Sequence, residues 1–181
     1  MLKIYRLRND SAIEYASQEL KKYLRMMMPE CGEIFISYAP EATKGFRLGL
    51  MADLGLDTSE AQDLELDDIL HIDTDGENGI LAGSNPRSVL LATYRFLQEN
   101  GCRWLFPGID GEYIPRTALK PQSYHKMADI RYRGHTTEGD PSIYHVVDYM
   151  DYHAKQELNR YGVHGVHNYH IRFYRHRFNE K

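Results

Sequence analysis

The stretch between residues 79 and 107 restricts the fold of this chain more than any other part of the sequence. It contains a predicted strand, a turn at residues 83–86, a helix and a second strand. Asn85 is a typical helix N-cap, Pro86 a typical first helical residue, and Asn100-Gly101 a typical helix end. Apolar side chains recur on adjoining rows of this helix, which predicts one buried face. A strand that passes straight into such a helix packs it back on its own sheet, so we predict an α/β fold.

The residues before this stretch add a helix and several short strands. Residues 11–14 form a Ser-x-x-Glu capping box, and apolar residues at helical spacing follow before Pro29 and Gly32 end the helix. Strands are predicted at residues 2–7, 33–39, 45–51, 68–73 and 79–83, the last two joined by a hairpin turn. The acidic run at residues 53–68 holds seven carboxylates and no Lys or Arg. It is typical of a solvated loop and, less often, of a cation site.

A change in composition separates two parts of the chain. Residues 107–124 are rich in Pro, Gly and polar groups, so we predict a domain boundary there. Residues 1–120 are expected to form an α/β (α+β) domain, a small mixed sheet with two helices packed on it. Residues 125–181 are expected to begin with a strand at 129–134 and an amphipathic helix that runs from Asp140-Pro141 to Gly162. Because one strand gives this helix too few apolar partners, we expect it to dock on the first domain, dimerise or disorder.

The amino-acid composition excludes several classes of protein for this chain. Hydrophobic residues make up 42% of the chain and charged residues 27%, enough apolar material for a core. The formal charge of −4 argues against nucleic-acid binding, which usually needs a strongly basic domain. Cys31 and Cys102 have no metal-ligand spacing, and no apolar run of about 18 residues exists to span a membrane. The first residues resemble a strand more than a signal peptide, so a cytoplasmic location is expected, or secretion if a leader was removed.

Five segments in fixed order resemble a known domain. They are ELKKYL (19–24), GFRL (45–48), GILAGSNPR (79–87), YRFLQ (94–98) and GCRWLFP (101–107). This order is similar to the N-terminal α/β domain shared by family 20 β-N-acetylhexosaminidases, family 67 α-glucuronidases and a group of uncharacterised bacterial hydrolase-like proteins. The resemblance covers residues 1–120 well and 125–165 more loosely. It implies a noncatalytic domain that leans against a (β/α)8 barrel, and the barrel carries the active site.

The second part of the chain resembles the start of that barrel. Segment IRYRG (130–134) is similar to the first barrel strand of family 20 enzymes, where an Arg-Gly pair ends the strand and the Arg binds sugar hydroxyls. The resemblance therefore implies Arg133 as a substrate-binding residue, and a guanidinium fork suits two vicinal hydroxyls. Residues 135–140 depart from the family 20 pattern. His135 and Glu138 there, with His167 and Asn168 at the end of a second barrel strand expected at 163–168, are further candidates for sugar contacts.

The chemistry of glycoside hydrolysis usually needs two carboxyl groups that face the scissile bond. In the resembled families these groups follow later barrel strands, and a complete barrel takes about 250 residues. We therefore assign no catalytic residue in this chain and expect no cofactor. The sequence predicts the N-terminal accessory portion of a hexosaminidase- or glucuronidase-like hydrolase that is inactive alone. Its expected partner is a carbohydrate substrate bound through the complete barrel, and a homodimer through the exposed barrel helix is a further expectation.

Two other hypotheses stay open. The chain could be a free-standing carbohydrate- or protein-binding module. It could also be a metal-binding protein, because His164, His167 and His170 fall three residues apart and neutral imidazoles can share a metal. Arg and aromatic residues interleave at 172–178, a pattern found in nucleic-acid binding. A barrel helix accounts for them more simply.

Overall fold

The computed structural model of the chain describes residues 1–138 and 143–164. Its centre is a six-stranded mixed sheet in the order β2-β1-β3-β5-β4-β8. Strands β1, β2, β3 and β5 pair parallel with their neighbours among themselves, and only β4 runs the other way, antiparallel to both β5 and β8. The bounds are β1 Leu2–Arg6, β2 Ile34–Tyr38, β3 Phe46–Leu50, β4 Ile69–Thr74, β5 Gly79–Gly83 and β8 Gln122–Met127. The predicted strands at residues 2–83 are thus confirmed within a residue or two.

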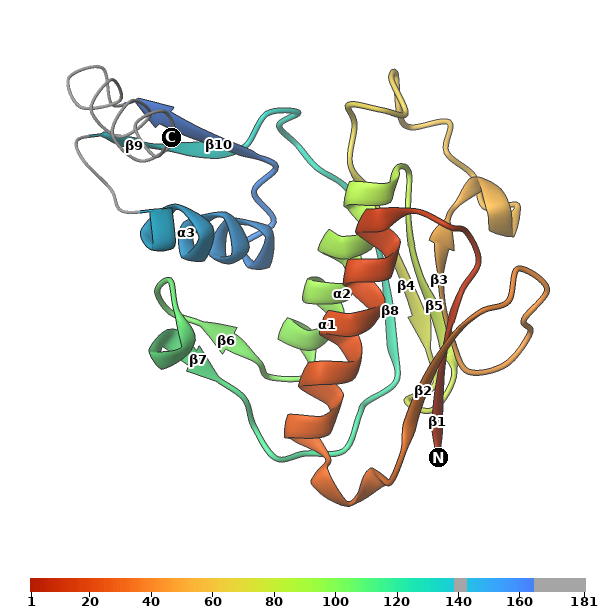
Figure 1. Cartoon of the computed structure of the whole chain (residues 1–181). Helices are drawn as coiled ribbons and strands as arrows, with labels where there is room; N and C mark the ends of the chain where they lie inside the picture. The colour runs from red at the N-terminus through yellow and green to blue at the C-terminus, as the bar shows by residue number, and fades with distance from the viewer. Residues whose placement is uncertain (139–142, 165–181) are drawn as a thin grey trace, which may run out of the picture.

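Two helices cover one face of this sheet (Figure 1). They are α1 (Ser11–Met27) and α2 (Pro86–Glu99), and they pack against each other as well as on the strands. Phe96 of α2 meets Phe46 of β3 with ring centroids 5.5 Å apart. The Trp104 ring lies edge-on to Tyr23 of α1 and Tyr94 of α2, at 5.3 and 5.5 Å. The predicted α/β fold, a mixed sheet with two helices packed on it, is therefore confirmed.

The helix caps follow their local sequences with one exception. Asn85 caps α2 as predicted, since its side chain accepts a hydrogen bond from the Ser88 N–H at 2.9 Å. The capping box predicted at Ser11 is wrong, because Asp10 is the N-cap of α1 and Ser11 is its first helical residue. One carboxylate oxygen of Asp10 accepts from the backbone of Ala12 at 2.8 Å and of Ile13 at 3.4 Å. A carboxylate there also suits the positive end of the helix dipole.

The two possible caps make different predictions for mutants. Asp10→Ala removes the acceptor of two backbone N–H groups, so we expect it to lower the free energy of unfolding by about 1 kcal/mol. Ser11→Ala is the matched control and should change the stability by less than about 0.5 kcal/mol. Urea unfolding followed by circular dichroism measures both. A larger loss in Ser11→Ala than in Asp10→Ala would contradict the observed cap.

Short elements connect the sheet to the rest of the chain. After α2 come β6 (Arg103–Trp104) and β7 (Glu112–Tyr113), which pair antiparallel. The 3-10 turns are η1 (Pro29–Cys31), η2 (Ala52–Leu54) and η3 (Ile109–Gly111). Strand β8 then returns to the main sheet and pairs with β4, so residues 122–127 belong to that sheet although the predicted second domain starts at 125. The division into two domains stays a prediction.

The last described part is a parallel β-α-β unit, made of β9 (Gly134–Glu138), α3 (Ile143–Lys155) and β10 (Arg160–His164). The strand predicted at 129–134 is wrong, because pairing begins only at Gly134. A Cβ there would lie 2.5 Å from the Arg160 carbonyl oxygen, so the two backbones approach closely only because this residue is glycine. The predicted helix end at Gly162 is also wrong. Glu157 has φ 58°, which breaks the helix, and residues 160–164 form a strand.

Helix α3 docks on the first part of the chain, which is one of the three outcomes expected for it besides dimerisation and disorder. Gln98 of α2 donates to the Lys155 carbonyl at 2.8 Å, and Gln156 donates to the Trp104 carbonyl at 2.8 Å. Tyr15 of α1 bonds Asp151 at 3.0 Å. Figure 1 shows α3 next to β6 and β7, with β9 and β10 on its other side.

Candidate functional site

The carboxyl ends of β9 and β10 form the first candidate site. The two strands are parallel, and their register pairs Glu138 with His164, the last residue of each strand. Ligand sites of parallel βα units form at the carboxyl ends of their strands. Glu138 therefore lies at the carboxyl edge of this two-stranded parallel unit. His164 is the direct neighbour of Glu138 in the sheet. The sequence suggested His164 only as a candidate metal ligand.

Arg133 lies at the opposite end of β9. The expectation that it ends a strand is wrong, because it directly precedes β9. Its guanidinium donates to three oxygens: Asp68 Oδ2 at 2.8 Å, the Glu157 carbonyl at 2.9 Å and the Ile130 carbonyl at 2.7 Å. Arg133 thus ties the β-α-β unit to the six-stranded sheet. Its binding of sugar hydroxyls stays a prediction.

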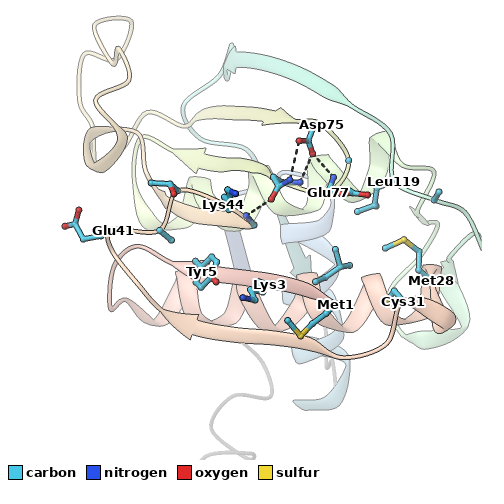
Figure 2. Close-up of a pocket in the computed structure, with 17 residues that line it drawn as sticks. Met1, Lys3, Tyr5, Met28, Cys31, Glu41, Lys44, Asp75, Glu77 and Leu119 are labelled. Atoms are coloured by element: carbon cyan, nitrogen blue, oxygen red, sulfur yellow. Dashed lines mark hydrogen bonds between the residues drawn. The ribbon is translucent and has the colours of Figure 1, made fainter.

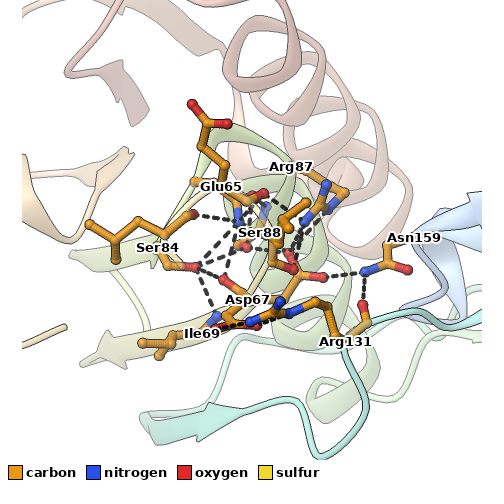
Figure 3. Close-up of polar contacts among 12 residues, drawn as sticks. Glu65, Asp67, Ile69, Ser84, Arg87, Ser88, Arg131 and Asn159 are labelled. Atoms are coloured by element: carbon orange, nitrogen blue, oxygen red, sulfur yellow. Dashed lines mark hydrogen bonds and ion pairs between the residues drawn. The ribbon is translucent and has the colours of Figure 1, made fainter. Parts of the chain in front are cut away.

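Asp68 is the centre of a polar cluster, and Figure 3 shows its partners Arg87, Ser88 and Asn159. Its side chain is fully buried just before β4, yet both oxygens are hydrogen bonded. Oδ1 accepts from Ser88 Oγ at 2.7 Å and from Arg87, at the start of α2, at 2.9 Å. Oδ2 accepts from Arg133 and from Asn159 Nδ2, both at 2.8 Å. One carboxylate therefore joins the main sheet, α2 and the segments before β9 and β10.

The charge state of this cluster follows from its contacts. Burial raises the pKa of Asp68, but hydrogen bonds from Ser88, Arg133, Arg87 and Asn159 outweigh it, so the pKa lies below its usual value. The neighbouring Asp67 receives two bonds from Arg131, at 2.6 and 3.0 Å, which lower its pKa to about 2. The interpretation of residues 53–68 as a solvated loop is therefore wrong for its last two residues. Their oxygens face arginines rather than solvent.

The other candidate in β9, His135, packs on α3. Its ring lies 6.4 Å from Tyr149 in a stacked arrangement and 5.7 Å from His153, which is buried. Tyr161 of β10 joins the same group, 5.0 Å from His153. Burial, followed by the charge of His135, lowers the pKa of His153. The His135 ring therefore lies against α3, although the residue itself is exposed.

A separate groove of about 980 Å³ lies at the end of the main sheet where β1 and β3 begin (Figure 2). Lys3 and Tyr5 of β1 line it, with Lys44 and the turn at residues 75–78. Gly45 is needed there, since its φ is 76° and a Cβ would lie 2.7 Å from the Lys3 carbonyl oxygen. The groove mixes charged groups with one aromatic ring, a composition that can bind a polar ligand.

Several predicted site residues lie outside the described part. His167, Asn168 and His170 fall in residues 165–181, and Asp140-Pro141 in residues 139–142. Among the described residues, no group of three or more His, Cys, Asp or Glu side chains could hold a metal ion. No helix within residues 1–138 and 143–164 is long and apolar enough to cross a membrane.

The fold is shared with two glycoside hydrolases of known structure. One is a GH138 enzyme that targets pectin rhamnogalacturonan II, with TM-score 0.55 and 12% identity over 90% of this chain and 24% of that chain. The other is a family GH115 4-O-methyl-α-glucuronidase with specificity for decorated arabinogalactans, with TM-score 0.58 and 12% identity over 92% of this chain and 25% of that chain. The chain thus spans about a quarter of these enzymes. No protein-family model and no curated protein matches it.

Proposed function

We propose that this chain is the N-terminal accessory portion of a glycoside hydrolase, joined to the first βα unit of its catalytic barrel and inactive alone. The six-stranded sheet with α1 and α2 is the accessory domain, and β9, α3 and β10 start the barrel. The observation that carries the proposal is the parallel β9-α3-β10 unit held on the sheet through Asp68. The two glycoside hydrolases with the same fold, of which the chain spans about a quarter, support it.

The site residues divide into two roles under this proposal. Glu138 contacts the sugar, because it ends β9 at the carboxyl edge. His167 and Asn168, which the sequence alone suggests, are proposed as further sugar contacts. Arg133 holds β9 in place through Asp68. The catalytic carboxyl pair comes from later strands of the barrel. We further propose that the substrate is a glycoside of the kind cleaved by hexosaminidases or by glucuronidases.

The test uses the polypeptide that carries this chain in its source cells. We expect it to hydrolyse aryl glycosides of N-acetylglucosamine or glucuronic acid. Glu138→Gln should lower kcat/KM roughly tenfold or more, since a hydrogen bond to a charged group contributes about 1.5–3 kcal/mol. The matched control is Glu99→Gln, at the end of α2, which should leave kcat/KM unchanged. Absence of hydrolysis on every glycoside would contradict the proposal.

A free-standing binding module is the second candidate function, and the groove of Figure 2 favours it. In that case the 181-residue chain itself should bind oligosaccharides in equilibrium dialysis. Tyr5→Ala, which removes the aromatic ring from the groove, should abolish this binding. Binding that instead disappears with Glu138→Gln would assign the sugar to the barrel strand.

A further inference from the structure

Two histidines that are far apart in the sequence face each other on the main sheet. His71 of β4 and His125 of β8 are direct partners in the antiparallel register. Their Nδ1 atoms lie 3.1 Å apart, and their ring centroids are separated by 5.3 Å. The adjacent residue Ile72 belongs to the core beneath the helices, and the partly buried Tyr124 packs against that core. Because side chains alternate along a strand, the histidines lie on the face of the sheet that α1 and α2 do not cover.

A carboxylate contacts one of the two rings. Glu60, from the acidic loop, places Oε1 at 3.1 Å from His125 Nε2. When Nε2–H donates to this carboxylate, the lone pair of the imidazole is on Nδ1, the atom that faces His71. Metal-bound histidines usually donate their other N–H to a carboxylate or a carbonyl in this way. This contact is an observation independent of the distance between the two rings.

The separation of the two nitrogens fits coordination to one ion. Metal–nitrogen bonds of about 2.05 Å to both Nδ1 atoms would subtend an angle of ~98° at 3.1 Å. This angle lies between the roughly 90° of a tetragonal copper site and the ~109° of a tetrahedral zinc site.

We propose that His71 and His125 bind one divalent transition-metal ion of the Zn²⁺/Cu²⁺ class through their Nδ1 atoms, with Glu60 as a positioning residue. Two imidazoles are the protein ligands, since the described residues offer no third His, Cys, Asp or Glu ligand, and water completes the coordination. The ion links the edge strand β8 to β4. The proposed ligand pair includes none of the C-terminal histidines, and the proposal does not depend on the proposed hydrolase function.

The experiment titrates the complete chain with ZnCl2 and, separately, with CuCl2 in a calorimeter. The background carries His164→Ala, His167→Ala and His170→Ala, which removes the histidines that the sequence indicated as ligands. We expect one equivalent of ion to bind in this background. Adding His71→Gln or His125→Gln should abolish the binding, and circular dichroism checks that each variant is folded.

Two further variants test the role of the carboxylate. Glu60→Gln should weaken the affinity about 10–100-fold, the usual effect of removing a partner of a metal-bound histidine. Glu65→Gln, an exposed carboxylate of the same loop, should leave the affinity unchanged. Binding that survives His71→Gln and His125→Gln, or no binding of either ion in the background, would overturn the proposal. An unchanged affinity in Glu60→Gln would overturn its positioning role.

Discussion

Asp68→Ala is expected to lower the free energy of unfolding by about 3 kcal/mol. The substitution leaves Arg133, whose side chain is 17% exposed, without its anion, and Arg87 also loses its ion pair. Removing one partner of a buried pair is costly because the other charge stays desolvated. Since Asn159 also loses one of the two acceptors of its amide group, the β9-α3-β10 unit should detach first. Urea unfolding gives the loss of stability, and amide exchange of residues 143–155 shows the detachment.

Asp129→Ala is the matched control for this experiment. Asp129 forms an ion pair with Lys126 at 2.8 Å, but both side chains are well exposed. Exposed pairs contribute little, so we expect a change below about 1 kcal/mol. Equal losses in Asp68→Ala and Asp129→Ala would contradict the role of Asp68 as the joint between the sheet and the unit.

Lys155→Met should also lower the free energy of unfolding by about 3 kcal/mol, through the other contact of α3. The Lys155 side chain is 5% exposed, and its ammonium bonds Glu112 Oε1 at 2.8 Å as well as Asp151. Burial lowers its pKa, but the bonds to Asp151 and Glu112 outweigh this and raise it, so the lysine is charged. Methionine fills a similar volume and leaves Glu112 buried without its cation. Urea unfolding measures the loss.

The double variant Lys155→Met/Glu112→Gln separates charge from packing. It removes both charges, while the hydroxyl of Tyr23, now 2.5 Å from Glu112 Oε1, can still donate to the glutamine. We therefore expect it to recover part of the stability lost in Lys155→Met. A double variant less stable than the single one would show that the salt bridge is not the main contribution of Lys155.

Short sequence patterns were sufficient to predict most strands of the six-stranded sheet and its two helices. Asn85-Pro86 and Asn100-Gly101 predicted both ends of α2, because caps depend on residues adjacent in the chain. The same rules could not choose between Asp10 and Ser11, since both residue types are good caps. The apolar spacing of Leu158 and Tyr161 continued the helix pattern past its true end. Only the strand pairing of residues 160–164 shows that end.

The candidate site depended on contacts that a local pattern does not contain. Asp68 and Arg133 are 65 residues apart, and His71 and His125 are 54 apart. The sequence contains one indication of the contact between Asp68 and Arg133. Arg131 and Arg133 are two residues apart, and they meet two adjacent carboxylates, Asp67 and Asp68, at the end of the acidic run. Without the fold, nothing assigns those carboxylates to those arginines.

The mass of the native polypeptide tests the central proposal most directly. An antibody raised against this chain would be used on an extract of the source cells under denaturing conditions. Because the chain spans about a quarter of the glycoside hydrolases that share its fold, we expect a polypeptide several times heavier than 21.1 kDa. A single native polypeptide of 21.1 kDa would contradict the proposal and favour a free-standing binding module.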